Sequence, residues 1–388
     1  MPPRILVVDD EPDVEHLIRQ KFRSQIRDNR FEFDFAQNGV QALHKVRQDE
    51  TIDLVLTDIN MPEMDGLTLL RKIEDLKNPA LKAVIVSAYG DMVNIRTAMN
   101  HGAFDFITKP IDFHDLEVTI AKTLSHLDLI KQAQKEHSEL ISVQRDLSIA
   151  ARIQQSILPR TFPPFPDRKE LAIYAEMVPM KEVGGDFFDF FFIDNDRLAL
   201  IIGDVSGKGV PAAILMAMSR TLLKAMAQQV VNPGECLRRV NNILAAESDP
   251  SMFVTIFYGV LNIRTGELQY CNGAHNPPCV LHADGTVEVL EEIGGTVIGM
   301  MENLEFDVKR TPLRVGDTLF MYTDGVTEAK NSHEELFSEA RLLECLQRSN
   351  GLPLEEMIRK TLGEIRTYSG GIPQPDDITM LAVRYLGT

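Results

Sequence analysis

Over the first 125 residues the chain alternates between short apolar runs and longer amphipathic stretches. The amphipathic stretches include VEHLIRQKFRSQIR and GLTLLRKIEDL, whose apolar positions have the spacing of helices with one buried face. Repeated strand-and-helix units of this kind predict an α/β, doubly wound domain, with helices on both faces of a five-stranded parallel sheet. The predicted strands are ILVV (Ile5–Val8), FEFDF (Phe31–Phe35), IDLVLT (Ile52–Thr57), AVIVS (Ala83–Ser87) and FDFIT (Phe104–Thr108).

The next part of the chain contains no proline or glycine from Phe113 to about Leu158. Apolar residues recur there mostly at spacings of 3, 4 or 7, with a skip near Gln134–His137. This pattern predicts a long amphipathic helix that pairs with a copy of itself in a coiled coil interrupted by a stutter. The alternative is a helix packed on its own domain. Prolines from Pro159 onward end the helix.

The last part of the chain mixes apolar strand runs with two or three helical patterns. Runs such as LALIIGDV and MFVTIFYGVLNI predict strands, and PAAILMAMSRTLLKAMAQQ, NPGECLRRVNNILAA and EEMIRKTLGEIR predict helices. Turns at hairpin spacing favour antiparallel pairing. We therefore expect an α+β domain of two stacked antiparallel sheets flanked by helices, and a division into domains at residues 1–125, 126–160 (a helical linker) and 161–388.

Composition narrows the classes of partner. The 57 acidic and 40 basic side chains give a formal charge of −17, which disfavours nucleic acid and anionic membranes as partners. Four cysteines without CxxC spacing indicate neither a zinc site nor a disulfide framework. The first residues, MPPRILVVDDEPD, do not read as a signal peptide, and no stretch of 18 apolar residues occurs. We expect a cytoplasmic protein.

Polar side chains lie at the ends of four of the five strands predicted for the first domain. Asp9 and Asp10 follow the first strand, Asp58 the third, Ser87 ends the fourth and Lys109 follows the fifth. Ligands of an open parallel sheet bind at the carboxyl ends of its strands, so these side chains share one crevice. Clustered carboxylates require a divalent cation such as Mg²⁺ or Mn²⁺, and one of them can accept a phosphoryl group. The alternative is a set of solvated residues at strand ends.

The motifs VVDDEP, TDINMPEMDG, VSAYGD and FITKP resemble the receiver domain of response regulators. The resemblance implies that Asp58 is the phosphoacceptor, and that a sensor histidine kinase or phosphotransfer protein is the donor. It also implies that Ser87 and Lys109 form a switch pair, and that Phe106 is an aromatic switch residue, or alternatively a core residue. The implied Mg²⁺ ligands are Asp10, Asp58 and the backbone carbonyl of Asn60, with Asp9 in support.

A second acidic set lies in the last domain, in the motifs GGDFFDF, GDVSGKG, TDG and PDDIT. Each motif places an aspartate at a predicted strand end, beside glycine or a second aspartate. Four such carboxylates share a pocket only with cations, and oxygen ligands without a His/Cys cluster favour Mg²⁺ or Mn²⁺ over zinc. Two such ions can activate a bridging water and hold a phosphoryl group. Singly, each motif is weak: TDG is more often a turn, and DDIT also fits a charged loop before the last strand.

Together with ARIQQSILP and CNGAHNPP, these motifs resemble the SpoIIE/RsbU-like branch of the PPM metal-dependent protein phosphatases. The resemblance implies hydrolysis of phosphoserine or phosphothreonine in proteins, with two Mn²⁺ or Mg²⁺ ions. His275 is a candidate general acid, although a loop-ordering role is preferred, and the sequence identifies no phosphate-binding arginine. The implied ligands are Asp204 bridging both ions with the Val205 carbonyl nearby, Asp324 and Asp376 (preferred over Asp377) on one ion, and Asp186 directly or through water.

Both resemblances predict a two-component response regulator whose output is a phosphatase controlled by Asp58. The phosphatase branch suggests a substrate, a phosphorylated anti-sigma-factor antagonist of the STAS type, and the linker helix suggests a homodimer. The alternative is a catalytically silent, phosphorylation-switched adaptor whose last domain is a binding module. A DNA-binding regulator is disfavoured, because the last domain is strongly acidic and has no helix-turn-helix signal.

Overall fold

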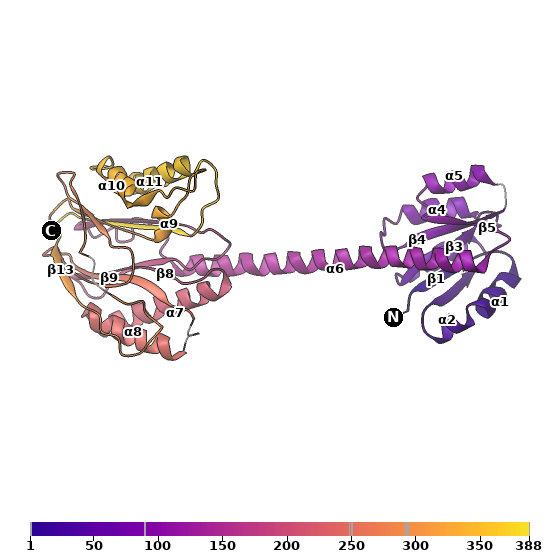
Figure 1. Cartoon of the computed structure of the whole chain (residues 1–388), viewed down its shortest axis with the longest axis horizontal. Coiled ribbons are helices and arrows are strands. Elements are labelled where there is room, and N and C mark those ends of the chain that lie inside the picture. The colour runs from indigo at the N-terminus through magenta and orange to yellow at the C-terminus, as the bar shows by residue number, and fades with distance from the viewer. Residues whose placement is uncertain (1, 89–90, 248, 250, 292–294, 388) are drawn as a thin grey trace. The chain divides into compact units, whose positions relative to one another are not determined.

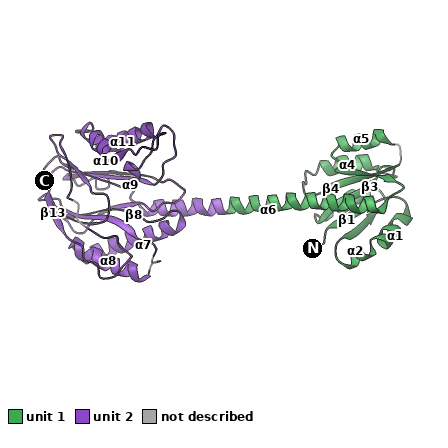
Figure 2. Cartoon of the chain, in the orientation of Figure 1, with its two compact units in different colours: residues 1–142 green, residues 143–388 purple. Residues whose placement is uncertain are grey.

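The computed structural model describes residues 2–88, 91–247, 249, 251–291 and 295–387. Tyr89 and Gly90 of the VSAYGD motif lie outside the described residues. The chain forms two compact units, residues 1–142 and 143–388 (Figure 2). The domain boundaries at residues 125 and 160 remain predictions, since helix α6 (Phe113–Ile157) runs through the first of them.

The first unit contains the predicted parallel sheet of five strands, in the order β2-β1-β3-β4-β5 (Figure 1). Successive side chains of β1 point to opposite faces, so Ile5 and Val7 enter one core cluster and Leu6 and Val8 another. The α/β prediction is confirmed, and the strand order reverses at the β1–β3 pair. The strands are β1 (Arg4–Val8), β2 (Glu32–Ala36), β3 (Ile52–Asp58), β4 (Lys82–Ala88) and β5 (Asp105–Lys109).

Helices cover both faces of this sheet. One core cluster includes residues of α3, α4 and α5, and the other includes residues of α1 and the first turns of α6. The stretch predicted as one helix, VEHLIRQKFRSQIR, is interrupted at Phe22, which is 2% exposed and packs against Phe31, Phe33 and Phe113. The helices before α6 are α1 (Pro12–Lys21), α2 (Arg23–Arg27), α3 (Gly39–Gln48), α4 (Gly66–Glu74) and α5 (Met92–Asn100).

Helix α6 is 45 residues long, as the absence of proline and glycine predicts. Its first turns are buried in the first unit through Leu116, Ile120 and Leu127. Its last residues meet the second unit, where Gln154 is buried. Several apolar side chains between these ends are more than half exposed in the single chain: Leu129, Leu140, Ile141, Val143 and Ile153. The helix therefore packs on its own chain at both ends, and its pairing with a second copy remains a prediction.

The second unit contains two five-stranded antiparallel sheets, which confirms the predicted α+β fold. The first sheet has the order β13-β10-β9-β8-β7, with β7 (Phe187–Phe192), β8 (Arg197–Val205), β9 (Val254–Asn262), β10 (Glu267–Gly273) and β13 (Lys309–Pro312). The second has the order β12-β11-β14-β15-β6, with β6 (Leu171–Val178), β11 (Cys279–Leu281), β12 (Val287–Val289), β14 (Thr318–Tyr322) and β15 (Ile378–Tyr385).

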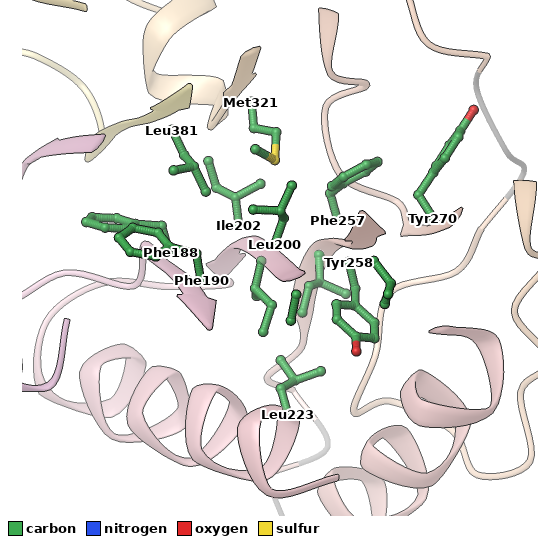
Figure 3. Close-up of a cluster of buried hydrophobic side chains, with 14 of the residues drawn as sticks. Phe188, Phe190, Leu200, Ile202, Leu223, Phe257, Tyr258, Tyr270, Met321 and Leu381 are labelled. Carbon is green, nitrogen blue, oxygen red and sulfur yellow. The ribbon is translucent and has the colours of Figure 1, made fainter. Parts of the chain in front are cut away.

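Helices α7 (Val210–Ala227) and α8 (Pro233–Glu247) pack on the first sheet, and α10 (Ser338–Gln347) and α11 (Leu354–Ser369) pack on the second. Between the sheets, Met321 and Leu381 point toward Leu200 and Ile202 of β8, while Leu223 of α7 lies on the other side of that strand (Figure 3). The sequence analysis missed α10 and the short helix α9 (Asp324–Thr327).

Helix α7 is long and apolar enough, by length and composition, to cross a membrane, and 33% of it is buried inside the protein. A core helix of a folded domain meets the same criteria, and α7 packs against β7, β8 and α8.

Candidate functional site

The first unit gathers its predicted acidic residues at the carboxyl end of the parallel sheet. Asp9 and Asp10 follow β1, and Asp58 is the last residue of β3. Each of the three offers a carboxylate oxygen, and these oxygens lie within 4.8 Å of one another. In the described part of the chain, this is the one acidic or His/Cys group that meets that distance criterion. Its all-oxygen composition fits Mg²⁺ or Mn²⁺.

Lys109, at the end of β5, links two of these carboxylates. Its Nζ donates hydrogen bonds to Oδ2 of Asp58 at 2.7 Å and to Oδ2 of Asp9 at 3.0 Å. Burial lowers the pKa of Lys109, but the bonds and charges of Asp58 and Asp9 outweigh burial and raise that pKa overall. Burial also raises the pKa of Asp9, against the opposing effect of its bonds to Glu11 and Lys109. The ammonium is therefore a fixed positive charge beside Asp58.

The other predicted residues of this site differ in exposure. Ser87 is 1% exposed, and its Oγ has no hydrogen-bond partner among the described residues. Asn60 is exposed and its backbone N–H points to Oδ1 of Asp58, which also accepts from the N–H of Ile59 at 2.6 Å. Phe106 is 37% exposed, so it is not a core residue in this structure. The free hydroxyl of Ser87 suits an incoming phosphoryl oxygen.

The second unit draws its acidic residues from the ends of strands in both sheets. Asp186 directly precedes β7, Asp204 lies near the end of β8, and Asp324 follows β14 in α9. Asp376 and Asp377 directly precede β15. The five charges act on one another: Asp204 is influenced by Asp186, Asp324, Asp376 and Asp377. The fold thus brings the predicted set into one neighbourhood from four separate segments, although less tightly than the trio of the first unit.

Burial, together with the charge of neighbouring carboxylates, raises the pKa values of Asp186 and Asp204. Burial, and then the charge of Asp204, raise the pKa of Asp186 well above its ordinary value. Burial, and then the charge of Asp324, raise the pKa of Asp204 to about 7. Oδ1 of Asp324 is buried without a hydrogen-bond partner among the described residues. Carboxylates this poorly compensated are suited to divalent cations, which favour the ionised forms.

The neighbours Asp376 and Asp377 have different contacts. Both oxygens of Asp377 accept backbone hydrogen bonds, Oδ1 from Met180 at 2.7 Å and Oδ2 from Gly185 at 2.9 Å. Oδ2 of Asp376 instead lies 2.8 Å from Nζ of Lys208, and its side chain is 31% exposed. Asp377 is therefore occupied in holding the loop before β7, which leaves Asp376 as the better candidate ligand.

Two glycines bring that loop close to the acidic residues. A Cβ on Gly184 would lie 1.9 Å from Oδ2 of Asp377, and one on Gly185 would lie 2.7 Å from the carbonyl oxygen of Val205. Only glycine fits either position. The Val205 carbonyl therefore lies against the loop that carries Asp186. It is also next to Asp204 in the chain, so both groups are near the position predicted for the metal ions.

Helix α6 contacts the same loop through Gln154. Its Nε2 donates to the carbonyl of Gly184 at 2.6 Å, and its Oε1 accepts from the N–H of Gly184 at 3.2 Å. Gln154 is 7% exposed and also borders a cavity of about 370 Å³ that Tyr174 and Phe188 help to line. The sequence analysis did not single out Gln154, although an amide at a buried helix position was a signal that could have done so.

His275 has the surroundings of a structural residue. It is 5% exposed, and its Nδ1 lies 2.9 Å from Oγ1 of Thr255. The side chain of Asn272 accepts from its backbone N–H and donates to its carbonyl. Burial lowers the pKa of His275 to about 4, so the imidazole is neutral at neutral pH. These contacts fit the preferred loop-ordering role and disfavour a general acid.

Two family models match this chain, one in each domain. Residues 5–121 match the family model of the response regulator receiver domain, and residues 194–386 match that of stage II sporulation protein E (SpoIIE). The chain combines a response-regulator receiver domain with a PPM-type phosphatase domain. The phosphatase-domain match begins after Asp186, so the GGD loop and Gln154 lie outside both family-model matches.

Individual relatives match different shares of the chain. Protein IcfG of Synechocystis is 34% identical over 61% of this chain, which spans 41% of IcfG. Phosphoserine phosphatase RsbU of Bacillus subtilis is 27% identical over 70% of this chain and 79% of RsbU. The solved RsbU and RsbW domains of a Mycobacterium tuberculosis protein align with a TM-score of 0.50 and 30% identity, over 56% of this chain and 61% of theirs. The SiaA-PP2C domain of Pseudomonas aeruginosa, at 22% identity, shares the fold with a TM-score of 0.57, over 64% of this chain and 98% of that domain.

Proposed function

We propose that this protein is a two-component response regulator whose output is metal-dependent dephosphorylation of phosphoserine or phosphothreonine on a regulatory protein. The observation that carries the proposal is the acidic set of the phosphatase domain, in which aspartates from four segments lie close enough to act on one another. Within this set Asp376 contacts Lys208, whereas Asp377 accepts backbone hydrogen bonds. The similarity to RsbU, a phosphoserine phosphatase by name, supports this class of reaction.

In the receiver domain, Oδ2 of Asp58 would attack the phosphorus of a phosphohistidine donor, and the phosphorus–nitrogen bond would break. Lys109 already lies 2.7 Å from that oxygen and would pair with the new phosphoryl group. The free hydroxyl of Ser87 would donate to a phosphoryl oxygen. Asp9, Asp10, Asp58 and the carbonyl of Asn60 would hold one Mg²⁺, which neutralises charge during the transfer.

In the phosphatase domain, Asp204, Asp324, Asp376, Asp186 and the Val205 carbonyl would hold two Mn²⁺ or Mg²⁺ ions. Such ions supply an activated water and neutralise charge on the phosphoryl group. Thr323 donates a hydrogen bond of 2.6 Å to Oδ2 of Asp186 and thereby fixes the orientation of that carboxylate. Asp377 keeps the loop before β7 in place through the amides of Met180 and Gly185. No protein nucleophile is needed for this chemistry.

Control by Asp58 would act through helix α6, which makes a polar contact with each domain. In the receiver domain, Lys131 of α6 pairs with Asp53 of β3, the strand that ends at Asp58. In the phosphatase domain, Gln154 holds Gly184, two residues before Asp186. The exposed apolar positions between these contacts would pair with a second copy of the chain in a homodimer.

A phosphorylated anti-sigma-factor antagonist of the STAS type is the proposed substrate, because the SpoIIE/RsbU-like motifs suggest it and the similarity to RsbU extends over 70% of this chain. This substrate and a histidine kinase or phosphotransfer donor would place the protein in the cytoplasm. A catalytically silent adaptor is the alternative that the following test would reveal.

The test is phosphate release from a phosphoserine protein or peptide in Mn²⁺, with and without beryllofluoride as a phosphoryl mimic on Asp58. We expect turnover that requires Mn²⁺, changes with the mimic and disappears in Asp204→Asn. Asp167→Asn, at an exposed position of the same domain, is the matched control and should retain activity. A folded wild-type protein that binds Mn²⁺ but releases no phosphate would favour the adaptor.

A further inference from the structure

Lys208 is a positive charge placed directly at the acidic cluster of the phosphatase domain. It follows β8 and precedes α7, and its Nζ lies 2.8 Å from Oδ2 of Asp376. The same ammonium donates to the carbonyl oxygen of Pro375 at 2.6 Å and contacts the sulfur of Met180 at 3.8 Å. Of these partners, Asp376 is the one that the proposed function assigns to a metal ion.

The segment around Lys208 leaves its side chain free to change partner. Gly207 and Gly209 flank it with φ angles of +86° and +78°, and the position of a Cβ on either glycine has no other heavy atom within 4 Å. The Lys208 side chain is 42% exposed. A lysine on an open turn between two glycines can move its ammonium by several ångströms without disturbing the core, since four rotatable bonds separate Nζ from the backbone.

We propose that Lys208 binds the substrate phosphate: it pairs with Asp376 until a divalent cation takes that carboxylate, and the released ammonium then contacts the phosphoryl group. This inference rests on the proposed function. An ammonium and a divalent cation compete for one carboxylate, and at close range they repel each other. The phosphoryl group of the substrate is dianionic, so it attracts the Lys208 ammonium once Asp376 no longer pairs with it. Lysine binds phosphate as a mobile point charge.

Lys181 provides a control for Lys208. Both lysines line a small cavity that Asp376 and Asp377 also line. Lys181 is exposed, and the ion pairs found among the described residues do not include it. Replacing either lysine removes one positive charge from the same region. Only the replacement of Lys208 also removes the ion pair with Asp376.

The experiment uses calorimetry on the full-length chain with Lys208→Met. We expect Mn²⁺ to bind several-fold more tightly, because its competitor for Asp376 is gone. We expect inorganic phosphate to bind the Mn²⁺-saturated variant roughly tenfold more weakly, the usual scale for loss of one charge-assisted hydrogen bond. In turnover, KM for a phosphoserine peptide should rise more than kcat falls.

Lys181→Met should leave both affinities close to those of the wild type, and Lys208→Arg should retain most of the phosphate affinity. Equal phosphate affinity in Lys208→Met and the wild type, or equal losses in Lys208→Met and Lys181→Met, would overturn the proposal. Thermal unfolding of each variant checks the fold. The binding measurements need no turnover, so a wild-type protein that binds Mn²⁺ and phosphate but hydrolyses nothing would refute the phosphatase function and leave the role of Lys208 standing.

Discussion

The receiver and the phosphatase domain both concentrate aspartates at strand ends, but they balance the charge differently. In the receiver, Lys109 lies between Asp9 and Asp58 and donates to both. In the phosphatase domain, Lys208 lies at the edge of the cluster, while burial and nearby carboxylates raise the pKa values of Asp186 and Asp204 in the interior.

Counting full charges shows what this difference means for cations. Three carboxylates and one ammonium in the receiver leave two negative charges, which one divalent ion balances. Five carboxylates and one ammonium in the phosphatase domain leave four, which two divalent ions balance. The number of carboxylates that no lysine compensates therefore sets how many divalent ions each site accommodates.

The largest expected effects separate Asp376 from Asp377. Asp376→Ala should lower Mn²⁺-dependent turnover at least ~100-fold, the upper end of losses from disturbed metal sites, with little change in thermal stability. Asp377→Ala should lower the free energy of unfolding by ~2–4 kcal/mol, because the N–H groups of Met180 and Gly185 lose their acceptors. Turnover assays and denaturant unfolding measure the two effects. The reverse pattern would contradict the division of roles.

A smaller effect is expected at the end of helix α6. Gln154→Leu should lower turnover ~10-fold, because the backbone of Gly184 loses both hydrogen bonds and the loop carrying Asp186 is less well positioned. The neighbouring Gln155 is exposed, so Gln155→Leu is the matched control and should remain active. Phosphorylation of Asp58, measured separately, should be the same in both variants. A fully active Gln154→Leu would show that the contact is dispensable.

The phosphatase domain should also lose stability as the pH rises in the presence of a chelator. The folded-state pKa of Asp204 is raised to about 7, so the folded protein holds a proton that the unfolded chain has lost. Stability is therefore present below the unfolded pKa of ~4 and decreases as the pH rises from there toward 7. Each kcal/mol lost should lower Tm by roughly 2–4 °C in a domain of this size.

Thermal unfolding between pH 5 and pH 8 measures this slope. Mn²⁺ should remove it, because the ion compensates the ionised carboxylates, and Asp204→Asn should flatten it even in chelator. A slope that is identical in the wild type and Asp204→Asn would assign it to other groups.

The smallest effect on stability is expected at Ser87. Ser87→Ala should change the free energy of unfolding by less than ~0.5 kcal/mol, because the buried hydroxyl has no partner to lose. Its effect should instead appear in the response of turnover to beryllofluoride, which we expect to weaken. A strong loss of stability would mean that the hydroxyl has a partner in solution.

Local pattern was sufficient for most of the elements and for the acidic motifs. Strands such as Ile52–Asp58 and the helix from Phe113 show their period directly, and glycine and proline mark where segments end. Helix α10 and the break at Phe22 were missed, because burial of side chains from distant segments decides them. The clustering of aspartates at strand ends indicated that divalent cations bind there. It did not indicate which hydrogen bonds or charges compensate each carboxylate.

The sequence by itself therefore determined the strand and helix pattern that predicts the two domain folds, the acidic motifs and the class of chemistry they indicate, since each is read from residues that are neighbours along the chain. Tertiary structure alone decided that Asp377 binds backbone amides 192 and 197 residues away while Asp376 faces Lys208. It likewise decided the attachment of Gln154 to Gly184 and the burial that keeps His275 neutral. Burial and hydrogen-bond partners depend on segments that meet only after folding, so no local pattern could supply these assignments.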